Sequence, residues 1–157
     1  MERKTSHADR VLEATSSASA AARSQIAASW HRSVQKHGLD PNNHRAPDRL
    51  EQAAIQSRIA ANEQFMMVAA PRLDALYSLV GRSGCAVLLT DADGVILDKR
   101  MADADTSTFE SWGLSTGAIW SEEREGTNGI GTCLTERRRL IIHQDEHFHA
   151  RNTGMSC

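Results

Sequence analysis

Apolar side chains recur at helical spacing between residues 20 and 37. Every fourth position carries one of them, at Ile26, Trp30 and Val34. This spacing places all three on one face of a helix. Gly38 can adopt the left-handed backbone that ends many helices, and Pro41 cannot continue one. We therefore predict a helix over residues 20–37, which ends at this glycine.

Polar segments lie on both sides of this predicted helix. Residues 1 to about 20 are rich in Ser, Ala and Thr, so we expect a loosely structured start to the chain. Residues 40–47 are also polar, and we expect them to form a linker between two helical regions.

A second helical pattern follows this linker. Asp48 and Glu51 have the spacing of a capping box, which predicts that a helix opens there. Pro71 interrupts the pattern, and it either kinks this helix or begins a new one. The apolar positions continue towards Gly81 and are Leu50, Ile55, Ile59, Phe65, Leu73, Leu76, Leu79 and Val80.

The pattern then changes from helix to strand. Residues 85–90 are an apolar run of strand length, and residues 95–98 are a second, shorter one. Between them lies Asp-Ala-Asp-Gly, in which Gly94 supplies the positive φ angle that a tight turn needs. We predict an antiparallel hairpin.

The last third of the chain predicts one more helix and one more strand. Residues 101–119 look irregular, a helix is expected from Thr127 to about Glu136, and residues 140–143 are expected to form a third strand. Helices that precede and flank an antiparallel sheet make an α+β architecture.

Composition narrows the class of protein. The chain has 157 residues, 40% hydrophobic and 4% aromatic, and its formal net charge is -2. Charges of both signs are spread along it, which argues against a nucleic-acid-binding face. No apolar run approaches the length of a membrane span, and the N-terminus lacks a signal-peptide core. Three widely spaced cysteines do not make a disulfide framework, so we expect a cytoplasmic protein.

The residues with the clearest binding chemistry lie between positions 120 and 128. A tryptophan and acidic residues lead into a turn at Gly126, and Thr127 is a good N-cap for the helix that follows. Asn128 adds an amide that can donate and accept. The candidate ligand-binding residues are Trp120, Glu122, Thr127, Asn128, His147 and Phe148. The alternative is that the loop residues cap a helix and anchor a long loop.

Other chemistry is less well supported. His143, His147 and His149, with Cys133 and Cys157, contain suitable metal ligands, but their spacing is not that of a zinc site. We expect no metal and no cofactor. Cys85 and Cys133 lie in apolar contexts that suggest buried thiols, whereas Cys157 lies in a polar one and could be reactive.

No catalytic residue is expected. The carboxylates of Asp103 and Asp105 lack a nucleophile or a partner group nearby in the sequence.

Five motifs in order resemble the N-terminal region of bacterial acetoin-catabolism-type transcription activators. They cover about residues 23–157 and lie at 28–33 with 38–41, 89–94, 117–122, 126–132 and 146–148. The resemblance implies a cytoplasmic GAF sensory domain that binds a small-molecule effector. It also implies a C-terminal output domain, a sigma-54-type ATPase with a Fis-type helix-turn-helix or the latter alone, which would supply all DNA binding.

The resemblance sets the expected domain organisation. Residues 1–47 would be an N-terminal helical arm, and residues 48–157 would be a GAF-like antiparallel sheet flanked by helices. The last strands and the closing helix of that domain would be missing after Cys157. We expect a homodimer formed through the helices before Gly81, no membrane association and no enzymatic activity. Two alternatives are a GAF-fold thiol enzyme acting on a small oxidised sulfur compound, and a dimerisation module without a ligand.

Overall fold

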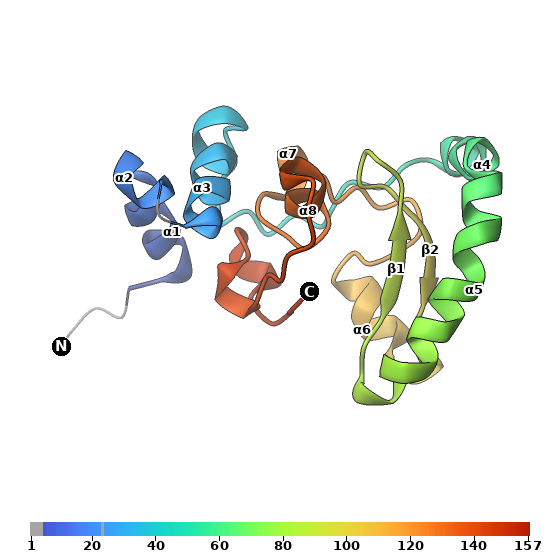
Figure 1. Cartoon of the computed structure of the whole chain (residues 1–157). Coiled ribbons are helices and arrows are strands. Elements are labelled where there is room, and N and C mark those ends of the chain that lie inside the picture. Colours follow the sequence, from blue (N-terminus) through green and yellow to red (C-terminus); the bar gives the residue numbers. More distant parts are fainter. Residues whose placement is uncertain (1–4, 23) are drawn as a thin grey trace. The chain divides into compact units, whose positions relative to one another are not determined.

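A computed structural model describes residues 5–22 and 24–157, and it divides the chain into two compact units (Figure 1). Unit 1 combines Met1–Arg45 with Trp120–Cys157, and unit 2 is Ala46–Ile119. The two units are described separately below. The expected division between an arm over residues 1–47 and a domain over residues 48–157 stays a prediction.

Unit 1 begins with helix α1 over His7–Thr15. Ser6 and Asp9 form a reciprocal capping box, with the Asp9 N–H donating to Ser6 Oγ at 3.1 Å. Ala8, Val11 and Thr15 are buried. The expectation of a loose start is therefore wrong over residues 7–15, because a local cap and a buried apolar face stabilise this helix. Residues 1–4 of that expectation lie outside the described part of the chain.

The helix predicted over residues 20–37 is interrupted. Helix α2 covers Ala18–Ala21, α3 covers Gln25–His31, and a π-helix, η1, continues over Arg32–Lys36. The break occurs because the Ser24 side chain accepts from the Ala27 N–H and starts a new helix. Gly38 has a φ of +64°, as its predicted place at the helix end requires.

The C-terminal part of unit 1 consists of short elements. They are α7 over Glu122–Glu125, α8 over Gly131–Glu136, and the 3-10 turns η4 over Gln144–Glu146 and η5 over Ala150–Asn152. The helix expected from Thr127 begins at Gly131 instead, so Thr127 is not its N-cap. Asn128 Oδ1 accepts the N–H groups of Ile130 and Gly131 at 2.9 and 2.8 Å and sets this later start.

The prediction of a third strand over residues 140–143 is wrong. Ile142 exchanges two backbone hydrogen bonds with Cys157, at 2.7 and 2.9 Å, and an isolated bridge joins His143 to Ser156. The segment is extended, but its hydrogen bonds are satisfied by the residues around Cys157. Within the described residues, the only sheet is the two-stranded one in unit 2.

Unit 2 packs helices against a hairpin. Its elements are α4 over Gln52–Ala61, α5 over Glu63–Val80, the 3-10 turn η2 over Gly81–Ser83, strands β1 over Val87–Thr90 and β2 over Ile96–Arg100, the 3-10 turn η3 over Asp103–Asp105, and α6 over Thr106–Ser111. Helix α5 packs on both strands, as Figure 1 shows. This mixed arrangement confirms the α+β class, and the residues expected to be irregular contain α6.

The predicted hairpin is confirmed. Strands β1 and β2 pair antiparallel, with Val87 opposite Arg100 and a bulge between Leu89 and Thr90. Gly94 has the expected positive φ, and Asp91 Oδ1 accepts the N–H groups of Asp93 and Val95. The turn chemistry read from the sequence therefore forms as predicted.

The helices before the hairpin differ from expectation. The capping box of Asp48 and Glu51 does not form, because residues 48–50 pair with residues 117–119 through backbone hydrogen bonds. The helical region breaks at Asn62, and Pro71 lies inside the continuous helix α5. No helix in the described residues is long and apolar enough to cross a membrane.

Candidate functional site

The six predicted ligand-binding residues all lie in unit 1, and all are buried. None of them exposes more than 3% of its surface; they are Trp120, Glu122, Thr127, Asn128, His147 and Phe148. Backbone or side-chain hydrogen bonds join several of them to one another and to the N-terminal helices. The clustering read from the sequence is present, and its role in ligand binding stays a prediction.

Glu122 is held by Ser29 on helix α3 and by Arg32, the first residue of η1. Arg32 Nε donates to one carboxylate oxygen at 2.7 Å, and Arg32 Nη2 and Ser29 Oγ donate to the other at 3.1 and 2.7 Å. Burial alone would raise the pKa of Glu122, but the hydrogen bonds from Arg32 and Ser29 outweigh it and lower this pKa. Arg32 also pairs with Glu136 at 2.7 Å. The carboxylate is ionised and fully engaged.

Three hydroxyl groups continue this network. Ser29 Oγ lies 2.6 Å from Thr127 Oγ1 and 3.3 Å from Thr132 Oγ1. The Asn128 N–H donates to the same Thr132 oxygen at 3.1 Å. Buried hydroxyls need partners of this kind, since an unpaired one costs free energy. The network thus joins residues about 100 positions apart in the sequence.

Asn128 uses its side-chain amide completely. Its Nδ2 donates to the carbonyl groups of Trp120 at 3.1 Å and Gly126 at 2.8 Å, while its Oδ1 accepts the two N–H groups that start α8. Gly126 has a φ of +62°, and a Cβ there would lie 2.5 Å from Phe148 Cγ. Only glycine meets both demands, so this turn is built to let Phe148 pack closely.

His147 and Phe148 are held from both sides. His147 Nδ1 lies 2.9 Å from the Gln144 carbonyl and Nε2 lies 3.2 Å from Cys157 Sγ. Burial lowers the pKa of His147, so the ring is neutral near pH 7. The Phe148 N–H donates to the Thr127 carbonyl at 3.1 Å. His7 Nε2 reaches the carbonyls of both residues at 2.9 and 3.2 Å.

The structure also places the residues that were considered as metal ligands and as reactive thiols. No group of three His, Cys, Asp or Glu side chains suited to a metal occurs in the part of the chain that the structure describes. Cys85 is exposed, not buried as its apolar neighbours suggested. Cys157 is an exposed residue, yet its sulfur lies against Gly129 and His147, and burial raises the pKa of the thiol. A raised pKa disfavours the reactive thiolate.

A surface hollow of about 410 Å³ lies beside this cluster within unit 1. Its lining residues include Ile26, Thr132, Arg138, Ile141 and Glu146. None of the six predicted ligand-binding residues lines this hollow.

Sequence reasoning missed Ser29 and Arg32 as members of the cluster. Both lie within the motif at residues 28–33, which was noted for its resemblance and for Trp30. Trp30 itself donates from Nε1 to the Glu146 carbonyl at 2.9 Å. The sequence did contain a signal for them. Ser29 and Arg32 lie about one turn apart on a predicted helix with an apolar face, and polar residues beside such a face need a partner when they are buried.

Comparison with known proteins agrees with these motifs. The family described as "MimR, N-terminal domain" matches residues 4–157. The acetoin catabolism regulatory protein of Cupriavidus necator is 35% identical over 82% of this chain and 19% of its own length. The MimR activator of the propane 2-monooxygenase operon in Mycolicibacterium smegmatis is 32% identical over 85% of this chain and 22% of its own. The chain thus spans about a fifth of the length of these relatives.

A further relative and a solved structure extend the comparison. The AcoR activator of the acetoin dehydrogenase operon in Bacillus subtilis is 29% identical over 86% of this chain. These relatives are named as a regulatory protein and as transcriptional activators. A chain in the crystal structure of the E. coli DhaR(N)–DhaL complex matches with a TM-score of 0.73 and 18% identity, over 80% of this chain and 42% of its own, and shows a shared fold. The chain belongs to the family of MimR N-terminal domains.

Proposed function

We propose that this chain is the sensory domain of a bacterial transcription regulator, and that it responds to a small-molecule effector. The observation that carries the proposal is membership of the MimR N-terminal domain family across residues 4–157. Two relatives are named as transcriptional activators, one of the propane 2-monooxygenase operon and one of the acetoin dehydrogenase operon. Transcription control would place the chain in the cytoplasm, and binding to DNA would belong to an output domain outside these residues.

The buried network of unit 1 supplies a route for the response. Arg32 and Ser29, on the N-terminal helices, bind Glu122, the first residue of α7, and Ser29 also bonds to Thr127 in the loop between α7 and α8. A shift of that loop would change these contacts and so move the helices. An effector that binds one arrangement better than the other would shift the population between them.

The six buried residues are proposed as effector contacts on the basis of their sequence pattern. Asn128 and Glu122 already have internal partners, so an effector that touched them would have to exchange those hydrogen bonds for its own. Such an exchange is one way to couple binding to the loop.

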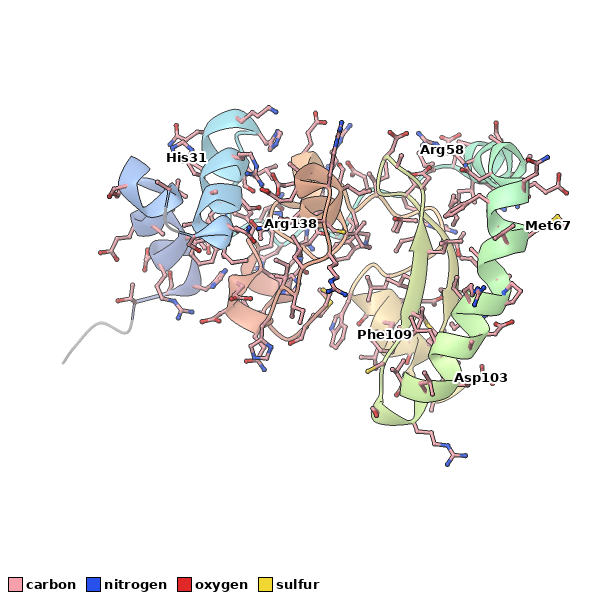
Figure 2. All side chains as sticks on the ribbon, in the orientation of Figure 1. His31, Arg58, Met67, Asp103, Phe109 and Arg138 are labelled. Atoms are coloured by element: carbon pink, nitrogen blue, oxygen red, sulfur yellow. The ribbon has the colours of Figure 1, made fainter. Side chains whose placement is uncertain are left out.

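Self-association is proposed through helix α5. Phe65, Val68, Leu76 and Leu79 on this helix are exposed and share one face at helical spacing. Met67, on another face, is also exposed, and Figure 2 shows it pointing away from the unit. Exposed apolar stripes of this kind commonly meet a second copy. Sedimentation velocity of the chain and of Leu79→Glu tests this: we expect a dimer that the substitution dissociates, and a monomer at all concentrations would contradict it.

The function is tested by binding and by gene expression. The purified chain is titrated by calorimetry with acetoin and with small alcohols, ketones and carboxylates; we expect at least one to bind and raise the melting temperature. In the bacterium, Arg32→Gln is introduced into the gene encoding the chain, and transcripts are measured with and without that compound. The proposal predicts that the substitution removes the response. If no compound binds and no transcript responds, the proposal is wrong.

A further inference from the structure

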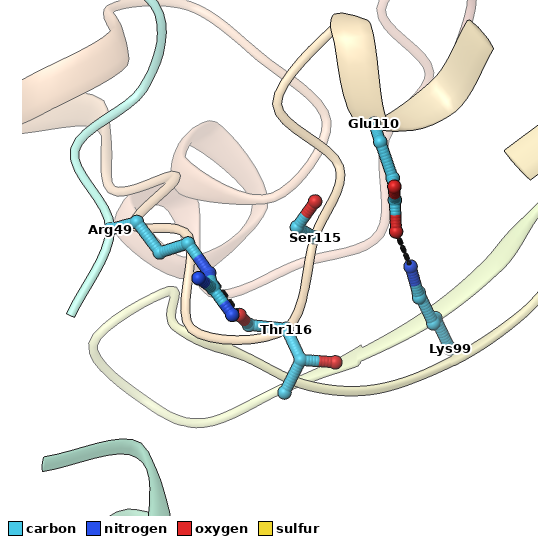
Figure 3. Close-up of a pocket in the computed structure, with 5 residues that line it drawn as sticks. All are labelled: Arg49, Lys99, Glu110, Ser115 and Thr116. Carbon is cyan, nitrogen blue, oxygen red and sulfur yellow. Dashed lines mark hydrogen bonds and ion pairs between the residues drawn. The ribbon is translucent and has the colours of Figure 1, made fainter. Parts of the chain in front are cut away.

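Unit 2 contains a hollow of about 450 Å³ that the sequence motifs did not predict. Five residues line it: Arg49, Lys99, Glu110, Ser115 and Thr116. Arg49 precedes α4, Lys99 lies on β2, Glu110 lies on α6, and the two hydroxyl residues follow α6. Figure 3 shows Arg49 on one side and the Lys99–Glu110 pair on the other, with Ser115 and Thr116 between them. This volume suits a small ligand.

Most polar hydrogens around this hollow lack partners. Arg49 Nε donates to the Thr116 carbonyl at 2.9 Å, and among the described residues its Nη groups have no hydrogen-bond partner. Lys99 Nζ uses one hydrogen, to Glu110 Oε1 at 2.9 Å. The side-chain hydroxyls of Ser115 and Thr116 make no hydrogen bond to described residues. The hollow therefore offers many donors and few acceptors.

The charge of the hollow is positive. Lys99 and Glu110 neutralise each other, which leaves the Arg49 guanidinium uncompensated. The pKa of Glu110 is lowered, first by the hydrogen bond from Lys99 and also by the charge of Arg49. Both cations therefore act on the same space, although solvent weakens each of them because the site is open.

The frame behind these side chains is preformed. The Leu50 N–H donates to the Gly117 carbonyl at 3.0 Å, and the Gly117 N–H donates to the Ile96 carbonyl at 2.7 Å. Gly117 has a φ of +88°, and a Cβ there would lie 2.3 Å from Ile55 Cδ1. The segment that carries Ser115 and Thr116 is thus fixed between β2 and the start of α4. A fixed frame lowers the entropy cost of binding.

We propose that this hollow binds a small carboxylate of the hydroxy-acid or oxo-acid class. The carboxylate would lie against the Nη groups of Arg49, in the two-point geometry that guanidinium favours, and Lys99 would share its charge. The hydroxyl or oxo oxygen of the ligand would meet Ser115 and Thr116. That this ligand is an effector, acting at a second site besides the buried residues proposed as effector contacts in unit 1, rests on the proposed sensory function; the binding site itself does not.

The test is an NMR titration of the ¹⁵N-labelled chain with sodium lactate and, separately, with lactamide. Lactamide has nearly the same shape and no charge. We expect lactate to shift the amide signals of Ser115 and Thr116 saturably, and lactamide to do so far more weakly. Shifts confined to the basic run at residues 137–139, or equal shifts with both compounds, would overturn the proposal.

Three variants sharpen this test. Arg49→Gln should weaken lactate binding by about tenfold or more, the usual scale for losing a charged hydrogen bond. Glu110→Gln should strengthen it several-fold, because Lys99 loses its competing partner. Arg82→Gln, which removes an exposed arginine outside the lining set, should leave it unchanged. Equal effects of Arg49→Gln and Arg82→Gln would contradict a specific site.

The site and the sensory function can fail separately. If lactate binds in the hollow and transcripts do not respond to Arg49→Gln in the bacterium, the binding site stands and its role as an effector site is wrong. Pyruvate, an oxo acid, is titrated in the same way. If transcripts respond to another compound while neither lactate nor pyruvate shifts the Ser115 and Thr116 signals, the sensory function stands and the carboxylate site is wrong.

Discussion

The buried cluster of unit 1 and the open hollow of unit 2 use the same side-chain chemistry in opposite ways. Each contains an arginine, a glutamate and two or more hydroxyls. In the cluster, Glu122 is 3% exposed and receives three hydrogen bonds from Arg32 and Ser29. In the hollow, the Glu110 side chain is 49% exposed, and Arg49 keeps its Nη groups without described partners.

Burial accounts for this difference. A buried charge is tolerated only when it is paired and hydrogen-bonded, so the cluster must satisfy its polar groups internally. An exposed pair such as Lys99–Glu110 is worth little and leaves donors free for a ligand. A ligand can therefore bind the hollow without displacing internal hydrogen bonds, whereas a ligand that contacts the cluster has to exchange them for its own.

Arg32→Gln is expected to have the largest effect on the free energy of unfolding. This substitution leaves the Glu122 carboxylate buried and without its cation, and breaking a buried pair in this way costs about 3–5 kcal/mol. Urea unfolding measures the loss. Arg10→Gln is the matched control in the same unit, because its pair with Asp145 is exposed and worth less than about 1 kcal/mol. Equal losses for both variants would remove the contrast between buried and exposed pairs.

The free energy of unfolding of unit 1 should also depend on pH. Burial lowers the pKa of His149 to about 4. The unfolded state, with a pKa near 6.5, binds the proton more readily, so the free energy of unfolding falls as pH drops from about 6.5 to about 4. The full loss from this residue is about 3 kcal/mol, at 1.36 kcal/mol per pKa unit.

His149→Gln should flatten this pH dependence and leave the smaller contribution of His147, whose pKa burial also lowers. The measurement is urea unfolding at several pH values between 4 and 7. An unchanged slope in the variant would show that His149 is not a buried neutral group.

Asn128→Ala should cost about 1–3 kcal/mol for each buried group left without a partner. The substitution removes the acceptor for the first N–H groups of α8 and the donor to Trp120 and Gly126. Thermal unfolding compares it with Asn42→Ala, an exposed position whose side chain makes no described hydrogen bond. A loss no larger than that of the control would mean that the cluster does not support the fold.

Arg49→Gln should have the smallest effect on stability, less than about 0.5 kcal/mol, because the residue is exposed. Urea unfolding checks this value beside that of Arg32→Gln. A loss comparable to that of Arg32→Gln would show that Arg49 holds the fold rather than offering donors to a ligand.

Local chemistry made some elements predictable. The hairpin followed from two apolar runs around an Asp-Gly turn, and the positive φ of Gly38 followed from its place after a helix. The sequence also contains the capping box of helix α1, at Ser6 and Asp9. The Ser-, Ala- and Thr-rich composition of the first 20 residues nevertheless led us to predict a loosely structured start. The extended segment at Ile142 could not be assigned to a sheet, because its partner is chosen by tertiary packing.

The candidate site was predictable in part for the same reason. Glu122, Thr127 and Asn128 lie within one short motif, so their clustering could be read from the sequence. Their partners Ser29 and Arg32 lie about 100 residues earlier, beyond any local pattern. The hollow joins residues from four separate segments, and only the folded chain brings them together.

The most direct test is a calorimetric titration of sodium lactate into Arg49→Gln and Arg32→Gln, two identical substitutions in the two regions. The titration is run at low temperature, with circular dichroism confirming that both variants are folded. We predict that Arg49→Gln loses about tenfold or more in affinity and that Arg32→Gln binds as the parent chain does. Loss of binding in Arg32→Gln with normal binding in Arg49→Gln would contradict the account.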